Sequence, residues 1–554
     1  MLKAKVLTPI PMRRGSRPAL ILGRGSIGLA NQRILAKTAV RDPERSRDAG
    51  GDMEGKSATA RARPPAAAES RPRRSVSRRA PGPPHPKTAV IVIHGMGEQW
   101  PMETLRGFVD AAWRFDDDLS EPWSEGETYS KPERITGNFE LRRITTRYWK
   151  HVPGETDPPR RVDFFEFYWA HLMQGNTLAS VTAWLVRLLV SKPSRVPRRL
   201  LGGWIAGLLL LIAGFMLALL TAVRPDLTRL GVPIWAWSVL AAVGAAFSAA
   251  WLRPVAGDAA RYLSPMPGNV AARQAIREAG IDLLTKIQDT GEYDRIIVAG
   301  HSLGSVIGYD VLNYTWGRLD QKSLAAAHPA GSPTMTLLAE LEKSADRLEK
   351  EPTPASLAEY RDLQRRYFRS LSTAKASNGR PLWLVSDFVT LGSPLSSSDV
   401  LLAKDRKTLD RKVASREIPS SPPQSEREKA VRFSYPPDAK ARTPHHGAAF
   451  APTVWTNIFY PNVLGIIGDF VSGPVAPLLG PAVRDVRVPI GFPTFRHLSY
   501  WARPERGWPA IRALRHALNL RERGERALWR DLAEANPIDA ERLPETPSCQ
   551  DLVP

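Results

Sequence analysis

Apolar runs recur along this chain with the lengths of buried strands. They cover Thr88–Ile93, Val162–Ala170, Arg295–Ala299, Asp387–Leu391, Thr453–Tyr460 and Val486–Ile490. Between and after them, Ser305–Trp316, Thr334–Lys350 and Ser356–Leu371 have the composition and spacing of helices. Uninterrupted apolar strands are typical of parallel sheets that helices cover on both faces. The pattern therefore predicts an α/β domain.

Two longer segments are apolar on every face. Leu200–Val223 and Leu230–Leu252 contain no charged residue, and arginines bound each of them. Each segment exceeds the ~20 residues that a helix needs to cross a ~30 Å hydrocarbon core. Only Arg224–Arg229 connect them. We expect a two-helix transmembrane hairpin within residues 191–256, and a pair of buried core helices is the alternative.

Positive charge indicates how this hairpin is oriented. Five Lys and Arg residues precede it between Arg187 and Arg199, and Arg253 and Arg261 follow it. The positive-inside tendency places both flanks on the cytoplasmic side, which in a bacterium is the inner face of the inner membrane. Because a hairpin returns the chain to the side it left, residues 88–190 and 257–510 can together build one domain.

Most of the net positive charge lies near the N-terminus. The net charge is +21, and residues 1–87 hold 20 Lys and Arg against 6 Asp and Glu, so +14 falls there and +7 on the remainder. This segment is rich in Arg, Pro, Ala, Gly and Ser, which predicts a disordered basic tail. Contact with an anionic membrane, a targeting role, or an upstream extension with Met53 as the start are alternatives. No aromatic residue is interleaved with the charge, so we expect no specific binding of nucleic acid.

Composition also divides the second half of the chain. Residues 320–380 form a helical insert, either a cap over an active site or a packed helical hairpin. Residues 404–446 are polar and rich in proline and serine, which predicts a long surface loop. Residues 511–554 read as a charged helical tail. The single cysteine, Cys549, excludes an intramolecular disulfide and a zinc site built from cysteines.

The chemistry-bearing motifs follow two of the predicted strands. The run at Thr88–Ile93 ends in the sequence H-G-M-G at residues 94–97, and the run at Arg295–Ala299 leads into G-H-S-L-G at residues 300–304. A strand, the pattern G-x-S-x-G and a helix are together the context of a nucleophile elbow, which exposes a serine on a sharp turn. The helix N-terminus beside that serine favours a developing oxyanion.

With these motifs the chain resembles the α/β-hydrolase superfamily of serine esterases and lipases. The resemblance covers about residues 88–175, 265–320 and 380–505. It implies a mostly parallel sheet flanked by helices, with Ser302 as the nucleophile and the backbone N–H groups of Met96 and Leu303 as the oxyanion hole. The supporting motif residues are His94, Gly95, Gly97, Gly300, His301 and Gly304.

A serine hydroxyl needs a base, and the base needs an acid that orients it. The family order is serine, acid, histidine, and His497 resembles the late histidine of the family. The other histidines after Ser302 lie in inserts or helical patterns. Many relatives place the acid near the end of the strand at Thr453–Tyr460, where this chain has proline and asparagine. We therefore prefer Asp469 as the acid, and Asp485 is the alternative.

These residues predict a membrane-anchored serine hydrolase that cleaves carboxylic esters through an acyl-enzyme. The anchor and a lipase-like Gly-Ser-Pro turn at residues 392–394 favour lipid or other apolar acyl esters as substrates, with the lipid bilayer as a partner. An acyltransferase or thioesterase with the same triad is one alternative, and a catalytically silent membrane scaffold is another. We expect neither a metal ion nor an organic cofactor to be required.

Overall fold

A computed structural model gives the structure of the chain. It describes residues 87–96, 100–120, 127–135, 140–149, 160–173, 205, 262, 267–425, 433–436, 440–463, 467–491, 496–502, 506, 508–525 and 528. Apart from Lys87 and Ile205, the basic tail and the expected transmembrane hairpin lie outside these residues, as do Gly97 and the end of the chain. No helix within the described ranges is both long enough and apolar enough to cross a membrane.

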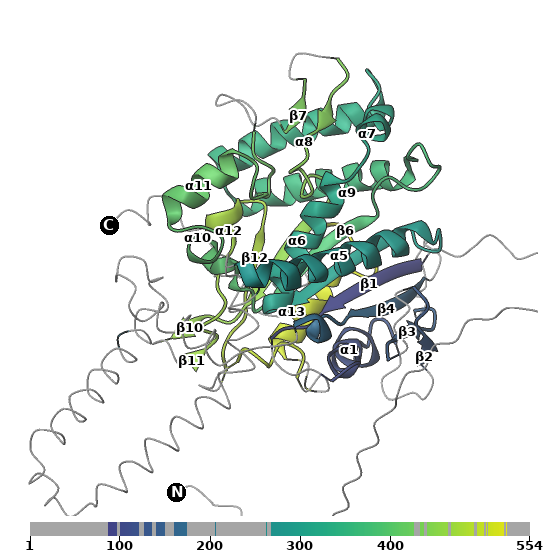
Figure 1. Ribbon diagram of the computed structural model, residues 1–554, viewed down its shortest axis with the longest axis vertical. Helices are drawn as coiled ribbons and strands as arrows, with labels where there is room; N and C mark the ends of the chain where they lie inside the picture. The colour runs from purple at the N-terminus through teal and green to yellow at the C-terminus, as the bar shows by residue number, and fades with distance from the viewer. Residues whose placement is uncertain are drawn as a thin grey trace, which may run out of the picture. The chain divides into compact units, whose positions relative to one another are not determined.

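One mostly parallel sheet of eight strands organises the described residues (Figure 1). Its strands are β1 (Lys87–Ile93), β2 (Thr128–Pro132), β3 (Arg142–Thr146), β4 (Arg161–Phe167), β5 (Arg295–His301), β6 (Val385–Leu391), β9 (Val454–Phe459) and β12 (Arg484–Arg487). The order across the sheet is β12-β9-β6-β5-β1-β4-β3-β2. The first six of these run parallel, and β3 and β2 complete one edge as antiparallel strands. Two small antiparallel pairs lie apart, β7 (Ser434–Tyr435) with β8 (Thr443–Pro444) and β10 (Asn462–Val463) with β11 (Ile467–Gly468).

Helices cover both faces of the sheet, as the apolar runs predict. The helices are α1 (Glu103–Val109), α5 (Pro267–Asp289), α6 (Leu303–Gly317), α7 (Gln321–Ala327), α8 (Pro333–Lys350), α9 (Pro354–Thr373), α10 (Ser398–Leu401), α11 (Arg406–Ala414), α12 (Ala476–Leu479) and α13 (Pro509–Leu518). Short turns of other helical types are η1 (Asp110–Arg114), η2 (Ala170–Met173) and η5 (Pro394–Ser397). Figure 1 shows α5, α6 and α9 on one side of the sheet and α1 on the other.

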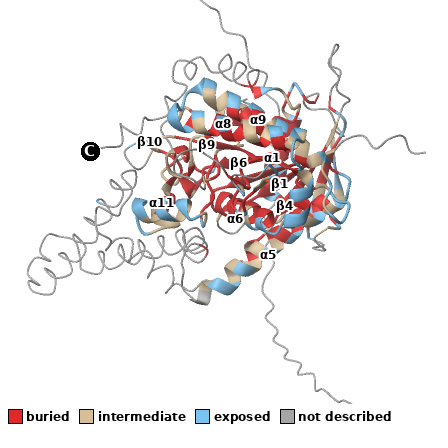
Figure 2. Ribbon diagram, turned by 90° about the horizontal axis from the view of Figure 1, so that it is seen from above, coloured by how far each residue is buried: buried red, intermediate tan, exposed pale blue. Residues whose placement is uncertain are grey.

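The two-residue period of a strand explains how the apolar runs serve both layers. In β1, Ala89, Ile91 and Ile93 belong to the core under α5 and α6, while Val90 and Val92 belong to the core under α1 and α13. Successive side chains of a strand point to opposite faces, so a strand buried on both faces must be apolar throughout. Figure 2 shows these central strands buried, with exposure confined to the outer helices and loops.

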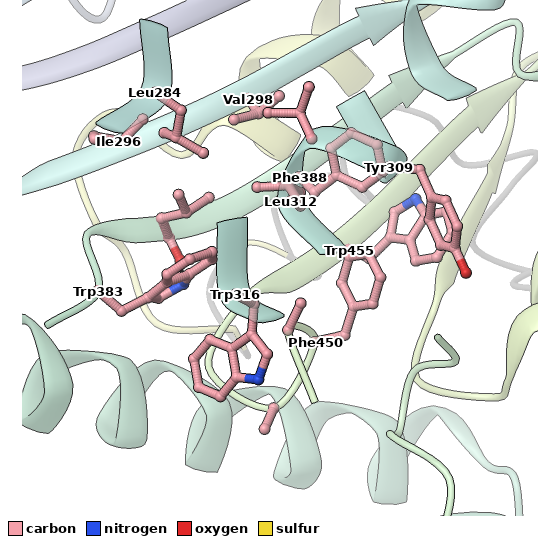
Figure 3. Close-up of a cluster of buried hydrophobic side chains, with 14 of the residues drawn as sticks. Leu284, Ile296, Val298, Tyr309, Leu312, Trp316, Trp383, Phe388, Phe450 and Trp455 are labelled. Atoms are coloured by element: carbon pink, nitrogen blue, oxygen red, sulfur yellow. The ribbon is translucent and has the colours of Figure 1, made fainter. Parts of the chain in front are cut away.

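Large aromatic side chains fill the core between the sheet and the helical insert. Trp316 and Trp383 contact each other edge to face with ring centroids 5.2 Å apart, and Phe450 stacks on Trp455 at 4.7 Å (Figure 3). Such pairs add about 0.5–1.5 kcal/mol each to the effect of burial. The insert is thereby joined to the same core as the sheet.

Helices α8 and α9 begin at good capping residues. Ser332 caps α8 through the N–H of Met335, and Thr353 forms a reciprocal capping box with Ser356 at the start of α9. A proline follows each cap, where its missing N–H costs nothing. Helix α9 contacts β6 and β9, and its arginines reach the amino-terminal halves of these strands. These contacts join the insert to two strands of the sheet.

The segment at residues 404–446 differs from the surface loop that its composition predicts. It contains α11, and residues 418–423 are buried. The backbone N–H of Ser421 donates to Leu479 O at 2.7 Å, and its carbonyl accepts from the N–H of Ala482 at 2.8 Å. Prolines supply most of the neighbouring positions and have no N–H to satisfy. A proline-rich segment can therefore be buried with few backbone partners.

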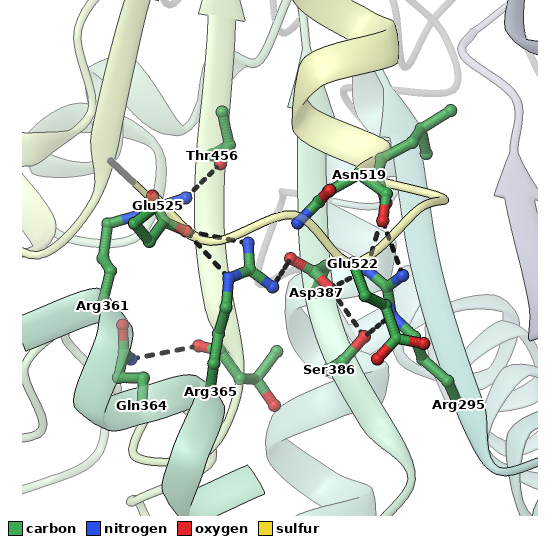
Figure 4. A network of polar contacts seen from close by, with 12 residues as sticks. Arg295, Arg361, Gln364, Arg365, Ser386, Asp387, Thr456, Asn519, Glu522 and Glu525 are labelled. Carbon is green, nitrogen blue, oxygen red and sulfur yellow. Dashed lines mark hydrogen bonds and ion pairs between the residues drawn. The ribbon is translucent and has the colours of Figure 1, made fainter. Parts of the chain in front are cut away.

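A buried network of charges lies at the amino ends of the strands (Figure 4). Arg295, at the start of β5, binds Asp387 of β6 with an Nη2–Oδ2 distance of 2.5 Å and also donates to the carbonyls of Leu518 and Asn519. Arg365 of α9 bridges Asp387 at 3.0 Å and Glu525 at 2.8 Å. The network joins the sheet, the insert and the segment after α13. The sequence predicts a separate tail that begins at residue 511. Leu518, Asn519 and Glu525 instead contact the arginines of the packed domain.

Glu525 is the point where three arginines converge. Its carboxylate contacts Arg361 at 3.3 Å, Arg365 at 2.8 Å and Arg484 at 2.7 Å, and its side chain is 1% exposed. Burial alone would raise the pKa of Glu525, but the charges of these arginines hold it well below its usual range. A carboxyl with a depressed pKa stabilises the fold at neutral pH, and this contribution is lost only when pH falls through the folded-state pKa.

Replacing Glu525 with glutamine tests this network. Glu525→Gln leaves three buried guanidinium groups without their shared counter-ion, and breaking a buried pair in this way costs about 3–5 kcal/mol. We expect a loss of this size in the free energy of unfolding at pH 7, measured by urea unfolding of the full chain. The control is Asp410→Asn, which removes the exposed i,i+4 pair with Arg406 and should cost under about 1 kcal/mol. Equal losses in the two variants would contradict the role given to Glu525.

Candidate active site

Ser302 occupies the turn between β5 and α6. Its backbone has φ 52° and ψ −126°, which non-glycine residues adopt only under strain. The N–H of Ser302 donates to Leu391 O at the end of β6 (2.9 Å), and its carbonyl accepts from the N–H of Ser305 (3.0 Å). These bonds fix the turn between the neighbouring strand and the first turn of α6. The strand, turn and helix that the motif predicts are present at this position.

The motif glycines stand where the structure has no room for a side chain. A Cβ on Gly300 would lie 2.6 Å from Gly304 O, and one on Gly304 would collide with the carbonyl oxygens of Ile93 and His94. A Cβ on Gly95 would approach the Cβ of Ser302 to 3.0 Å. The start of α6 therefore lies directly against the end of β1, with the H-G-M segment beside the serine.

Ser302, His497 and Asp469 form one continuous chain of contacts. His497 Nε2 lies 2.9 Å from Ser302 Oγ, and His497 Nδ1 lies 2.9 Å from Asp469 Oδ2. All three residues are buried. They come from three loops at the carboxyl ends of the sheet, because Asp469 follows β11 and His497 lies in the loop after β12. A histidine bonded to both a serine hydroxyl and a carboxylate is the arrangement that activates a serine.

Asp469 is held as an acceptor of several hydrogen bonds. Its Oδ1 accepts from the backbone N–H groups of Val471 at 2.9 Å and Ser472 at 3.3 Å, and its Oδ2 accepts from His497 and from the hydroxyl of Tyr500. Burial alone would raise the pKa of Asp469, but the bond and charge of His497, followed by the bond from Tyr500, lower it. The carboxylate is therefore ionised at neutral pH.

The alternative acid, Asp485, has a different environment. Its oxygens accept from the N–H groups of Val475 and Ala476 at the start of α12, each at 2.9 Å. It also accepts from Asn457 Nδ2 at 2.7 Å. These contacts tie β12 to β9 and to α12. The structure thus brings Asp469, and not Asp485, onto the imidazole of His497.

The two expected oxyanion donors lie on either side of Ser302. Leu303 is the first residue of α6, so its N–H lies at the positive end of the helix. Met96 directly follows Gly95, which lies against Ser302. Gly97, the last residue of this motif, lies outside the described residues.

His94 fixes the loop that carries Met96. Trp169, after β4, donates its backbone N–H to His94 Nε2 at 3.3 Å and its indole N–H to His94 O at 3.0 Å, and the two rings stack at 4.9 Å. Burial lowers the pKa of His94 to about 4, so the ring is neutral. Because Nε2 accepts from Trp169, the ring proton is on Nδ1, which donates to Gly95 O at 2.9 Å.

His301 connects the serine turn to the histidine loop. Its Nε2 donates to the backbone carbonyl of His497 at 2.9 Å, and its ring contacts Trp501 edge to face. Burial lowers the pKa of His301 to about 3, which keeps the ring neutral beside His497. His301, the residue before Ser302, therefore supports the position of His497 and carries no charge itself.

Sequence reasoning did not assign a role to Trp169, Gly392 or Tyr500. Tyr500 follows His497 by three residues, and Gly392 begins the Gly-Ser-Pro turn after β6. A Cβ on Gly392, at φ +62°, would lie 2.8 Å from the Tyr500 ring, 3.3 Å from Asp469 Oδ2 and 3.3 Å from His497 Cε1. What links these residues to the site is the closeness of the turn at Gly392 to the loop of His497 and Tyr500. The two segments are far apart in the sequence, so only the fold brings them together.

Three comparisons with known proteins gave no match: no family model, no characterised protein and no solved structure matches this chain. Among the described residues, no group of three or more histidine, cysteine, aspartate or glutamate side chains is arranged to hold a metal ion.

The close packing at Gly392 gives a stability prediction with a matched control. Gly392→Ala and Gly379→Ala both place a Cβ at positive φ, +62° and +79°, and each should lose about 1–2 kcal/mol for the backbone conformation. Nothing lies within 4 Å of a Cβ at Gly379. Gly392→Ala should therefore lose a further ~1–3 kcal/mol through overpacking. Unfolding in urea measures the difference, and equal losses would show that the turn can shift away from Tyr500.

Proposed function

We propose that this protein is a serine hydrolase with an α/β-hydrolase fold, and that it cleaves carboxylic esters. The observation that carries the proposal is the chain from Ser302 Oγ to His497 to Asp469, with 2.9 Å at each step. The order serine, acid, histidine along the sequence and the strand-turn-helix at Ser302 agree with that superfamily. The mostly parallel sheet places all three residues at its carboxyl end, where ligands bind in open α/β sheets.

The proposed reaction proceeds in two halves. His497 Nε2 takes the proton of Ser302 as Oγ attacks the ester carbonyl, and the N–H groups of Leu303 and Met96 stabilise the oxyanion. The protonated imidazole then gives its proton to the leaving alcohol, and the C–O bond to that alcohol breaks. In the second half, His497 takes a proton from water as the water attacks the acyl carbonyl, and the imidazolium returns that proton to Ser302 Oγ as the acyl C–Oγ bond breaks. The products are the carboxylic acid and the free Ser302 hydroxyl.

Two features support an apolar acyl substrate at a membrane. Trp100, which follows the oxyanion segment, is 77% exposed, and Leu498, the neighbour of His497, is 72% exposed. Contiguous exposed apolar surface is typical of sites that bind apolar ligands, and Leu498 directly follows His497 in the sequence. The apolar segments at residues 200–223 and 230–252 supply the proposed anchor. The proposed enzyme therefore acts on lipid or similar apolar esters from the bilayer.

Fluorophosphonate labelling of the detergent-solubilised full chain tests the serine hydrolase. The wild type should be labelled, and Ser302→Ala should abolish labelling. His497→Ala and Asp469→Asn should slow it by at least about a hundredfold, because triad members act as a unit. Asp485→Asn should label within a fewfold of the wild type.

Three results would count against this proposal or parts of it. A folded wild type that is not labelled, or label on another residue, would overturn the hydrolase. Full labelling of Asp469→Asn with loss in Asp485→Asn would move the orienting role to Asp485. Circular dichroism of each variant separates loss of chemistry from loss of fold.

The acyl preference has its own test. Each CH₂ group moved from water to an apolar site contributes about 0.8 kcal/mol, so p-nitrophenyl octanoate should exceed p-nitrophenyl acetate in kcat/KM by about tenfold or more. Both esters are compared below their critical micelle concentrations, with Ser302→Ala as the blank. A kcat/KM that falls as the acyl chain lengthens would contradict an apolar substrate and leave the esterase chemistry standing.

A further inference from the structure

Tyr500 is fully buried and contacts Asp469, the last member of the Ser302–His497–Asp469 chain. Its hydroxyl lies 2.8 Å from Asp469 Oδ2 and 3.2 Å from Ser472 Oγ, and it accepts the backbone N–H of Tyr460 at 3.3 Å. An ionised carboxylate only accepts hydrogen bonds, so the proton on this hydroxyl points to Asp469. Burial, followed by the charge of Asp469, raises the pKa of Tyr500 well above its usual value, so the hydroxyl keeps that proton.

The oxygen that Tyr500 contacts is the one that contacts the imidazole. Asp469 Oδ2 accepts from Tyr500 and from His497 Nδ1, while Oδ1 accepts from two backbone N–H groups of the following residues. Those two N–H groups belong to the same loop as Asp469 and would move with it. Tyr500 and His497 share a loop with each other and not with Asp469. The backbone N–H of Arg496 also joins the two loops by donating to Gly468 O at 2.7 Å, but the Tyr500 hydroxyl contacts the Asp469 carboxylate itself.

The Tyr500 ring is itself fixed by elements from across the sheet. Gly392, in the turn after β6, leaves space for the ring edge, and the ring of Tyr460, after β9, lies 5.0 Å from it. His301, in the serine turn, lies 5.8 Å away between ring centroids. The position of the hydroxyl is thus set by the ends of three parallel strands.

We propose that Tyr500 is a positioning residue for the reaction: its hydroxyl holds Asp469 in the orientation that directs the imidazole of His497 toward Ser302. It acts through Asp469 and has no contact with Ser302 Oγ in this arrangement. The inference rests on the proposed function, because it assigns Tyr500 a part in the same chemistry. A tyrosine that merely fills the core would need its ring and not its hydroxyl.

Removing one hydroxyl separates these two roles. Tyr500→Phe keeps the ring and deletes the bond to Asp469. Tyr309→Phe is the matched control, because Tyr309 is a buried tyrosine whose hydroxyl donates to Pro419 O at 2.6 Å, within the core under α6. Tyr309→Phe loses one buried hydrogen bond, whereas Tyr500→Phe loses the bond to Asp469 together with the contacts to Ser472 Oγ and the N–H of Tyr460.

The kinetic prediction concerns kcat and its pH dependence for p-nitrophenyl acetate. Tyr500→Phe should lower kcat about ten- to a hundredfold, the size expected for a hydrogen bond to a charged group, with KM within about twofold of the wild type. Tyr309→Phe should change neither by more than about twofold. An unchanged kcat in Tyr500→Phe would overturn the proposal, and so would an equal fall in both variants.

The acidic limb of the rate profile gives a second readout. Loss of the Tyr500 bond removes one cause of the lowered pKa of Asp469, so the limb should move to higher pH by about half a unit or more. Other titratable or charged groups close to Asp469 or to its neighbour Tyr460 are His497, His301 and Arg496, and these are the same in both variants. Circular dichroism over the same pH range shows where the folded fraction stays constant, and the midpoint is read within that range. An unshifted midpoint would count against the proposal.

A measurement without turnover distinguishes failure of this inference from failure of the proposed function. The proton of His497 Nδ1 in its bond to Asp469 should give a downfield ¹H resonance that His497→Ala removes. Tyr500→Phe should shift or broaden this resonance, and Tyr309→Phe should leave it in place. If the wild type neither turns over ester nor takes the fluorophosphonate, the hydrolase fails, and this resonance alone decides whether Tyr500 positions Asp469. A resonance unchanged in Tyr500→Phe would refute that positioning.

Discussion

The contact between the start of α6 and the end of β1 is the constraint on which the site depends. Gly304 lies against the carbonyl oxygens of Ile93 and His94, and no other residue fits there without displacing backbone. The strained turn at Ser302 is kept because strand, helix and neighbouring strand all fix it, and such strain persists only where the surroundings determine it fully. From this one approach follow the position of the serine hydroxyl, the nearby helix N-terminus and the place of the H-G-M segment.

The two ends of the sheet use charge in different ways. At the carboxyl ends, a single carboxylate and neutral histidines surround the serine, and burial keeps His94 and His301 uncharged. At the amino ends, Arg295, Arg361 and Arg365 share two carboxylates and tie the insert to the sheet. In the first arrangement the imidazole of His497 contacts a hydroxyl and a carboxylate. In the second, four arginines surround two carboxylates.

The sequence predicted the parts of this structure that depend on local pattern. The parallel strands, helices α6, α8 and α9, and the turn at Ser302 follow from apolar runs, caps and glycine spacing. Asp469 and His497 followed from the order of residues in a resembling family, and the structure brings His497 onto Ser302 and Asp469 onto His497. Composition did not predict that residues 418–423 and Glu525 are buried. Proline-rich segments and charged residues usually lie at the surface, and composition alone does not distinguish the buried ones. Tyr500 depends on the meeting of three loops, and no local pattern specifies that meeting.

The charge network also bears on how the protein is made. Synthesis from the N-terminus produces Ser302, Asp469 and His497 before Leu518, Asn519 and Glu525, which supply partners to the arginines at the other end of the sheet. A nascent chain that already contains every group of the candidate site therefore still lacks Glu525, the carboxylate that Arg361, Arg365 and Arg484 contact. The domain reaches its full stability only after residue 525 has left the ribosome. The groups of the candidate site are therefore synthesised before Glu525, which contacts the arginines at the other end of the sheet.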